Sequence, residues 1–550
     1  MTNLYDRHSA LLARAVEALR TRAFWTPFPE VPSGKVYGET AKADGIAAFE
    51  GLVGNAFDMP GHPETRRVGR ENAPWGKSLS ITYPAADPAT LIAASEKAAE
   101  PWASADPETR AGILLEALTR LNAMSFLIGH ATMHTTGQAF PMAFQAGGPH
   151  AQDRGLEAVA AAYAEMTGSA TAATWEKPQG KRDPITLEKR WRIVPRGLSL
   201  MIGCQTFPNW NGYPGLFASL ATGNTAIVKP HPGAILPLAL TVKVLREVLT
   251  EEGFPADVVL LAADEPGAEV TKKLIETHAF SIIDYTGSSV FAAWLRKNAG
   301  SALVFTEETG VNSITITGTD DFAGMCDNIA FSLSLYSGQM CTSPQNLYLP
   351  KDGIETDEGA KSFDDVVSGI VDAIDRLLSD GAQASSICGA IANAATFARV
   401  EKARQAGRVV RESRETGLGA SATPLLVVAD DREGGLERDE CFGPVSFFIA
   451  CDDAHDAIAR ASAIAAEKGA ITAALYATDG ALIEEAANAF SKAGVNLSVN
   501  LTGNIYVNQS AAFSDYHVTG ANPSGNASLT DTAFVAPRFR RVMIRWPRAA

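Results

Sequence analysis

Short apolar segments alternate with longer stretches of helical periodicity through the middle of the chain. The apolar segments span four to six residues, a usual length for buried strands, and the stretches between them have apolar side chains every three or four positions. The strand-like segments lie at 198–203, 225–228, 258–261 and 280–283, and the helical stretches at 236–250 and 267–278. This alternation predicts βαβ units and a doubly wound, Rossmann-type sheet over about 191–318, so the expected fold class is α/β.

The chain before and after this region also has a clear pattern. Residues 10–19 have helical spacing, and loops rich in Pro and Gly follow them. Residues 87–166 have a helical pattern, and Asp87 with Pro88 predicts a helix start, because aspartate caps a helix and proline suits its first turn. A second α/β block is expected over 308–494.

Composition and charge narrow the possible functions. The 550 residues are 46% hydrophobic, and 47 basic against 62 acidic side chains leave a net charge of −15. Binding to nucleic acid or to anionic membranes is disfavoured, because phosphate contacts need clustered Lys and Arg. The N-terminus lacks a basic segment followed by an apolar one, and no run approaches the roughly 18 apolar residues of a membrane span, so we expect a cytoplasmic protein.

Six cysteines are scattered along the chain. They form no Cys-x-x-Cys pair, and the chain has no His-Glu-x-x-His segment, so we expect no metal site. Isolated cysteines in a chain of this size agree with a reducing compartment.

A thiol and a carboxylate form the candidate catalytic pair. Cys341 ends the tetrapeptide Gly-Gln-Met-Cys, and Glu307 lies 34 positions upstream within 306–310. A thiolate can attack a carbonyl and a carboxylate can then activate water, which together suffice for covalent catalysis. We expect burial to raise the pKa of the Glu307 carboxyl. Glu308 beside it is the alternative base.

These two segments together resemble the nucleophile and base elements of the aldehyde dehydrogenase superfamily. The segments 222–230, 285–288 and 440–445 resemble the elements with which that superfamily binds a nicotinamide cofactor, NADP or NAD. The resemblance implies an aldehyde dehydrogenase-like fold, with a cofactor domain, an α/β catalytic domain and a small bridging domain. It also implies oxidation of an aldehyde to an acid through a cysteine thioester.

The same resemblance assigns five residues to the cofactor. Lys229 is expected to hold the adenosine ribose, and a helix N-terminus at Gly287 and Ser288 is expected to face the pyrophosphate. Glu440 is expected to hold the nicotinamide ribose, with Phe442 against the ring.

Two positions depart from the family pattern. Pro232 stands where NAD-using relatives often have a glutamate, and without that carboxylate a ribose phosphate is not repelled, so NADP is expected to be as acceptable as NAD. Thr206 stands where relatives have the Asn that binds the oxyanion. Its hydroxyl is one expected donor and the Cys341 backbone N–H another, and three amide side chains lie between 205 and 211.

The organisation implied by the resemblance has four parts. They are an N-terminal extension (1–85), a cofactor-binding domain (86–307) with a bridging ribbon at about 172–193, a catalytic domain (308–494) and a C-terminal bridging and oligomerisation segment (495–550) with strand-like residues near 532–546. In this superfamily the bridging strands pair between subunits. A homodimer or homotetramer is therefore expected.

The segments 204–219 and 516–523 resemble the ring-opening aldehyde dehydrogenases of phenylacetic acid degradation. That resemblance implies a CoA-linked semialdehyde from aromatic catabolism as substrate. Bifunctional members carry a hydratase-like domain that this chain lacks, so a separate hydratase partner is implied. The dehydroadipyl-CoA semialdehyde dehydrogenase of benzoyl-CoA degradation is a close alternative. Further alternatives are a CoA-acylating dehydrogenase, against which Glu307 argues, and a catalytically silent homologue, against which Cys341 argues.

Overall fold

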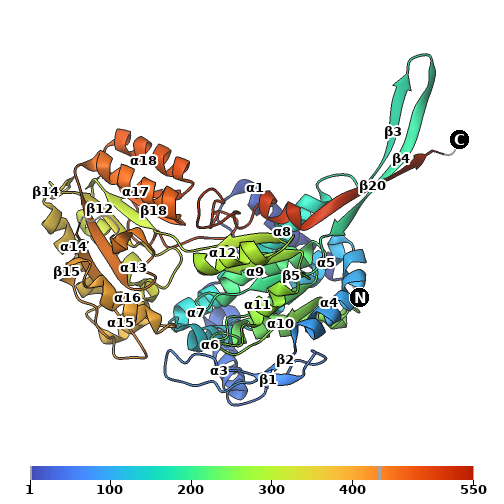
Figure 1. Ribbon diagram of the computed structural model, residues 1–550, viewed down its shortest axis with the longest axis horizontal. Coiled ribbons are helices and arrows are strands. Elements are labelled where there is room, and N and C mark those ends of the chain that lie inside the picture. The colour runs from blue at the N-terminus through green and yellow to red at the C-terminus, as the bar shows by residue number, and fades with distance from the viewer. Residues whose placement is uncertain (1–2, 431–434, 549–550) are drawn as a thin grey trace.

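The computed structural model describes residues 3–430 and 435–548. Two α/β bodies lie side by side, and the C-terminal part of the chain crosses between them (Figure 1). The α/β fold class expected from the sequence is confirmed.

The N-terminal part of the chain consists mainly of helices, which pack on the first body, the one built around the sheet formed within residues 199–307. Its elements are α1 (Leu4–Thr21), α2 (Gly34–Tyr37), α3 (Ala41–Leu52), β1 (Arg66–Val68), β2 (Tyr83–Ala85), α4 (Pro88–Ser104), α5 (Pro107–Ala123), α6 (Ser125–Thr136), α7 (Phe140–Gly147) and α8 (Pro149–Thr167). Helix α4 begins as predicted, because the Asp87 carboxylate accepts a hydrogen bond from the Thr90 N–H at 3.0 Å and Pro88 is the first helical residue. Helix α1 packs against α5 and α8, which fixes the N-terminal extension to this body.

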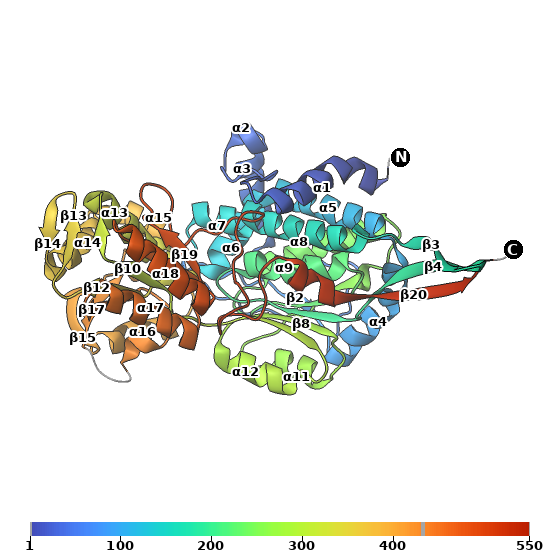
Figure 2. The same ribbon diagram turned by 90° about the horizontal axis from the view of Figure 1, so that it is seen from above.

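The first sheet is parallel and has the order β7-β6-β5-β8-β9. Its elements are β5 (Ser199–Ile202), α9 (Pro208–Ala221), β6 (Ala226–Lys229), α10 (Leu236–Glu251), η1 (Ala256–Val258), β7 (Val259–Leu261), α11 (Val270–Glu276), β8 (Ile282–Thr286), α12 (Ser289–Asn298) and β9 (Leu303–Glu307). Helices α11 and α12 cover one face, and α8 and α9 cover the other (Figure 2). The chain leaves β5 towards β6 and returns to β8, so the carboxyl ends of β5 and β8 flank the switch point at which such sheets bind ligands.

The second sheet has the order β15-β16-β17-β12-β10-β18-β19 and is parallel except for the antiparallel pair β15–β16. Its strands are β10 (Ser313–Ile316), β12 (Asn346–Pro350), β15 (Gly407–Arg411), β16 (Leu425–Ala429), β17 (Val445–Cys451), β18 (Thr472–Tyr476) and β19 (Asn496–Val499). The helices of this body are α13 (Phe322–Ser334), η2 (Leu335–Gly338), α14 (Phe363–Leu377), α15 (Gly381–Cys388), α16 (Ala395–Ala403), η3 (Leu436–Arg438), α17 (Ala454–Lys468) and α18 (Gly480–Ala493). A small sheet of β11 (Gly318–Thr319), β13 (Ile354–Thr356) and β14 (Gly359–Lys361) lies beside it.

Three antiparallel strands form a ribbon that extends away from both bodies (Figure 1). They are β3 (Ala172–Gln179), β4 (Arg182–Pro195) and β20 (Phe539–Pro547), in the order β20-β4-β3. The expected strands at 172–193 are confirmed. The expectation of strand for 532–546 is wrong for its first part, which forms α19 (Thr532–Val535) and η4 (Ala536–Arg538). The Asp531 carboxylate caps this helical turn by accepting from the Phe534 N–H at 2.8 Å.

No single helix in the described part of the chain is long and apolar enough to span a membrane. The consecutive helices α5 and α6, which are largely buried and bent relative to each other, reach that length and apolar character only when they are taken together.

Candidate active site

The loop that carries Cys341 follows η2 and has an unusual backbone. Tyr336, Ser337 and Gly338 all have positive φ, at 51°, 50° and 62°. A Cβ on Gly338 would overlap the carbonyl oxygen of Gly443, so the turn needs glycine there. The close contact joins the loop that carries Cys341, the candidate nucleophile loop, to the segment around Gly443.

Hydrogen bonds from side chains hold this loop in place. The buried Gln339 amide donates to the Ala390 carbonyl at 2.9 Å and accepts from the Ala392 N–H at 2.9 Å. Asn312 donates to the Cys341 carbonyl at 2.7 Å. The glutamine of the Gly-Gln-Met-Cys segment therefore positions the thiol and does not itself face it.

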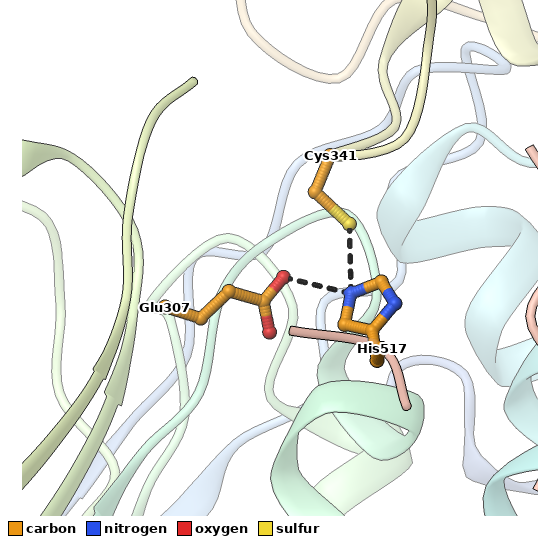
Figure 3. Close-up of side chains that lie close together, drawn as sticks. All are labelled: Glu307, Cys341 and His517. Carbon is orange, nitrogen blue, oxygen red and sulfur yellow. Dashed lines mark hydrogen bonds and ion pairs between the residues drawn. The ribbon is translucent and has the colours of Figure 1, made fainter. Parts of the chain in front are cut away.

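Cys341 and Glu307 belong to one cluster of side chains, in which a histidine contacts both of them. The Cys341 Sγ is 3.4 Å from the Nε2 of His517, which is 3.1 Å from the Glu307 Oε1 (Figure 3). Asn211 donates to the second oxygen of Glu307 at 2.8 Å. Strand β9 ends at Glu307, so the carboxylate projects from the carboxyl edge of the first sheet towards the loop of the second body.

His517 was not identified as a site residue from the sequence. It lies in the C-terminal segment, where 516–523 were recognised only as resembling a subgroup, and no local pattern links it to Cys341. Its side chain is buried and its ring meets the Trp210 ring edge-on, with centroids 4.5 Å apart. The Arg154 guanidinium lies 4.9 Å from the centroid of Trp210. These contacts fix the ring orientation.

The neighbouring acid, Glu308, lies outside this cluster. It forms an ion pair with Arg296 and accepts from the Thr306 hydroxyl at 2.8 Å. Successive residues of an extended chain point to opposite sides, so only one of the two glutamates can face the thiol. In this structure that residue is Glu307.

The electrostatics of the cluster differ from the sequence expectation. Burial alone raises the pKa of the Glu307 carboxyl, but the charge of His517 and the hydrogen bonds from His517, Cys341 and Asn211 outweigh it and hold the pKa below its usual value. The expectation of a raised pKa is therefore wrong, because His517 was not foreseen. Burial, with the nearby Glu307 charge, raises the pKa of the Cys341 thiol well above its usual value. At neutral pH the carboxylate is ionised and the thiol keeps its proton.

The residues expected to bind the oxyanion are separated in the structure. Thr206 is half-buried, and within the described chain its side chain makes no hydrogen bond to Cys341. Of the nearby amides, Gln205 donates to the Ala392 carbonyl and Asn209 donates to the Gly147 carbonyl at the end of α7, whereas Asn211 faces the cluster. The Cys341 N–H donates no hydrogen bond to any residue that the structure describes, so it remains available as a donor. The oxyanion role of Thr206 stays a prediction.

Lys229 is at the carboxyl end of β6 and is already paired. Its Nζ lies 2.7 Å from the Oδ1 of Asp264, and both side chains are buried. Burial lowers the pKa of the Lys229 ammonium, while the Asp264 charge opposes this effect. Sequence reasoning missed Asp264, which is 35 positions away.

Gly287 and Ser288 form the turn between β8 and α12. The Ser288 hydroxyl caps the helix by accepting from the Phe291 N–H at 3.3 Å. A Cβ on Gly287 would overlap the Tyr285 hydroxyl, so a larger residue here would have to displace that ring. The turn therefore presents the N-terminus of α12 at the edge of the first sheet.

Glu440 lies at a cavity of about 610 Å³ between the two bodies. The cavity is lined by residues of both, among them Ser289, Arg296, Gly310 and Glu440. The Glu440 Oε1 accepts from the Gly310 N–H at 3.3 Å, and burial raises the pKa of this carboxyl to about 7. Phe442, two residues on, is half-buried, and its carbonyl accepts from Arg399 at 2.9 Å.

Comparison with known proteins decides the family. The family model described as "Aldehyde dehydrogenase family" matches residues 70–533. The chain belongs to the aldehyde dehydrogenase family. The superfamily resemblance drawn from the sequence is therefore confirmed, and the chain is an enzyme of this family.

Solved structures and named relatives agree with this assignment. The structure of an NAD-dependent aldehyde dehydrogenase from Burkholderia multivorans is 50% identical, covers 100% of both chains and has a TM-score of 0.98. A mutant of 1-pyrroline-5-carboxylate dehydrogenase from Thermus thermophilus is 20% identical, covers 96% of this chain and 99% of its own, and has a TM-score of 0.77, a likeness that shows the fold alone. N-succinylglutamate 5-semialdehyde dehydrogenase of Burkholderia multivorans is 26% identical over 72% of this chain and 78% of its own length.

These relatives do not support the finer subgroup. The names given above refer to succinylglutamate semialdehyde and pyrroline carboxylate, and none refers to phenylacetic acid or to CoA. The resemblance of 204–219 and 516–523 to the ring-opening subgroup stays a prediction. The four-part domain division and the assigned site roles also stay predictions.

Proposed function

We propose that this aldehyde dehydrogenase oxidises a semialdehyde to its carboxylic acid, with Cys341 as the nucleophile and Glu307 as the base. The observation that carries the proposal is the contact chain from the Cys341 Sγ through the His517 Nε2 to the Glu307 Oε1, at 3.4 Å and 3.1 Å. A thiol, an imidazole and an ionised carboxylate in contact provide both a nucleophile and acceptors for its proton.

The first half-reaction forms a bond between the Cys341 sulfur and the aldehyde carbon. The thiol proton passes to the His517–Glu307 pair, because the carboxylate is ionised while burial keeps the thiol protonated. The carbonyl oxygen gains the negative charge, and the Cys341 N–H is a donor placed to stabilise it. When bound, the nicotinamide cofactor accepts the hydride that leaves this carbon.

The second half-reaction hydrolyses the resulting thioester. The proton taken up in the first half-reaction leaves to solvent before this step. Glu307 then accepts a proton from water, the water oxygen bonds to the carbonyl carbon, and the carbon–sulfur bond breaks. The acid is released and Cys341 regains its proton. Asn211, which donates to Glu307, keeps the carboxylate oriented through both steps.

The residues assigned to the cofactor fit a nicotinamide dinucleotide, NAD or NADP. The N-terminus of α12 at Gly287 and Ser288 suits a pyrophosphate, and Glu440 at the cavity offers a carboxylate to ribose hydroxyls. Lys229 offers a donor, and its partner Asp264 puts a carboxylate beside it. Pro232 brings no charge, and the Asp264 carboxylate neutralises the Lys229 ammonium that would otherwise attract a ribose phosphate, which favours NAD over NADP.

The substrate proposal combines the apolar surroundings of the thiol with the relatives' names. Met142, Phe207, Trp210 and Met340 pack in one cluster next to the nucleophile loop, and such a lining suits the chain of a long semialdehyde. The named relatives act on semialdehydes or their cyclic forms that bear carboxylates. A CoA-linked semialdehyde of aromatic degradation is the finer proposal, and it rests on the sequence resemblance alone.

The experiment that tests the reaction and its substrate follows the absorbance of reduced cofactor. We expect the wild-type enzyme to oxidise a carboxylate-bearing semialdehyde with a far higher kcat/KM than acetaldehyde, and to release the free acid. Equal kcat/KM for a CoA-linked semialdehyde and its free-acid counterpart would remove any role for CoA. An acyl-CoA product in the presence of free CoA would instead support the CoA-acylating alternative. Absence of any aldehyde oxidation would support the silent homologue.

The ribbon supports the proposal of a homodimer or homotetramer. Its exposed apolar side chains are Trp175, Ile185, Val194, Val542, Met543, Ile544 and Trp546. An extended sheet with exposed apolar side chains and a free edge at β3 needs a partner surface. Sedimentation analysis would test this, and a monomer at micromolar concentration would contradict it. A separate hydratase partner is proposed only with the CoA-linked substrate.

A further inference from the structure

The three side chains of the cluster are also a set of metal ligands. The Cys341 Sγ, the His517 Nε2 and a Glu307 oxygen all lie within 4.8 Å of one another. A thiolate, an imidazole and a carboxylate are the three donor types that zinc uses in proteins. We propose that this cluster binds a zinc ion reversibly and that the bound ion blocks the nucleophile.

The spacing of the donors fits tetrahedral zinc. The usual zinc–ligand lengths place sulfur and nitrogen about 3.6 Å apart, and nitrogen and oxygen about 3.4 Å apart, on the edges of a tetrahedron. The observed separations are 3.4 Å for Cys341 to His517 and 3.1 Å for His517 to Glu307. These two edges, which both include the His517 Nε2, need to lengthen by only about 0.2–0.3 Å to hold the ion. The third edge, from the Cys341 Sγ to a Glu307 oxygen, is shorter than 4.8 Å.

The three ligands are also held in place before a metal arrives. They come from separate segments, the end of β9, the nucleophile loop and the C-terminal segment. Asn211 fixes Glu307, Asn312 fixes the Cys341 backbone, and the Trp210 ring packs on His517. A preformed set of ligands lowers the ordering entropy that binding must overcome.

The cluster differs from a structural zinc site in ways that make the binding reversible. The chain supplies three ligands, so a fourth position is left for water, as in zinc sites that exchange their ligands. The His517 Nδ1 is buried without a hydrogen-bond partner among the described residues, and the lack of such a partner typically weakens a site by 10–100-fold.

Binding would remove the thiol from the reaction. Zinc takes the place of the thiol proton, which is released to solvent, and the sulfur lone pair then binds the metal instead of the aldehyde carbon. The inhibition rests on the proposed function of Cys341, whereas the binding does not. The two can therefore fail separately.

Cobalt(II) is the probe for the test, because a cobalt–thiolate bond absorbs in the near ultraviolet and tetrahedral cobalt absorbs in the visible. The full-length enzyme, treated first with a chelator, is titrated with Co²⁺. We expect both absorptions to appear with one equivalent bound. Zn²⁺ should displace the cobalt and inhibit aldehyde oxidation over the same concentration range.

Variants distinguish this site from other thiols. Cys341→Ser should lose the near-ultraviolet band, and His517→Asn should weaken cobalt binding at least tenfold. Cys204→Ser is the matched control, because the Cys204 Sγ lies 3.6 Å from the Asn211 Oδ1 beside the cluster, and it should keep the band. Circular dichroism verifies the folding of each variant.

Two results would overturn the inference: a wild-type enzyme that oxidises aldehydes yet gives no cobalt band, or a band that persists in Cys341→Ser. If the wild type gives the band but oxidises no aldehyde, the metal site stands and the proposed function fails.

Discussion

Glu440→Gln isolates the effect of a partly buried carboxylate charge on stability. Burial raises the pKa of the Glu440 carboxyl from 4.5 to about 7. Since the pKa in the folded state lies above the unfolded value, Glu440 keeps its proton up to a higher pH in the folded protein than in the unfolded chain. The stability of the wild type therefore falls as the pH rises from about 4.5 to about 7, and it is constant above that. A glutamine keeps the carbonyl oxygen that accepts from the Gly310 N–H but does not titrate.

The magnitude follows from the two pKa values. Ionised Glu440 lowers the free energy of unfolding by about 0.8 kcal/mol at pH 5 and about 3.3 kcal/mol at pH 8. The stability of Glu440→Gln relative to the wild type should therefore rise by about 2.5 kcal/mol between these pH values. Any unsatisfied hydrogen bond of the new amide lowers stability equally at both, so it cancels from this difference.

Scanning calorimetry of the apoenzyme at pH 5 and pH 8 measures this difference. From the usual unfolding entropy per residue, 2.5 kcal/mol shifts Tm by about 2 °C if the whole chain unfolds together and by about 6 °C if residues 308–494 unfold as a separate unit. The exposed Glu415→Gln is the control and should follow the wild type at both pH values. A Tm difference between Glu440→Gln and wild type that is the same at pH 5 and pH 8 would refute the reasoning.

The remaining predictions concern the reaction and the cofactor. Cys341→Ser should reduce turnover at least about a thousandfold, as followed by reduced cofactor, and wild-type turnover in this variant would exclude the thioester route. Glu307→Gln leaves His517 to accept the thiol proton but removes the base that activates water. It should therefore give a stoichiometric burst of reduced cofactor and a slow steady state in stopped-flow measurements, whereas Glu308→Gln should not; the reverse result would move the base by one residue. Asp264→Asn should shift the ratio of kcat/KM towards NADP by at least about tenfold, because the Lys229 charge is then no longer neutralised and attracts the ribose phosphate. Pro232→Glu should lower kcat/KM for NADP with little effect on kcat/KM for NAD. If both Asp264→Asn and Pro232→Glu keep the wild-type ratio of kcat/KM for NADP to that for NAD, neither residue contacts the ribose.

Much of the fold could be predicted because its signals are local. The strands β5 to β8 are short apolar segments separated by helices, and each was found within one to three residues from its pattern. The start of α4 needed only Asp87 and Pro88. The helical turn at 532–538 was missed because polar and apolar residues alternate there as they do in a strand. The one signal that favours a helix is the capping residue Asp531.

The members of the site could be predicted only where a motif marks them. Cys341 and Glu307 each lie in a short segment with a known spacing. Lys229 was recognised in the same way, but its partner Asp264 was not, since the pairing arises when the ends of β6 and β7 lie side by side. The proposed preference for NAD therefore rests on a carboxylate one strand away, whereas Pro232 alone had suggested that NADP is equally acceptable.

The electrostatics of the site could not be predicted at all, because they depend on a contact between distant parts of the chain. His517 lies 176 positions from Cys341 and 210 from Glu307, and the C-terminal segment brings it there by crossing between the two bodies. Without the imidazole, burial alone would raise the pKa of Glu307, as the sequence suggested. With it, the carboxylate is ionised at neutral pH and the thiol is not. In the proposed mechanism, the proton that the thiol loses therefore has an acceptor before any aldehyde arrives, and the same three atoms would hold the proposed zinc ion in place of that proton.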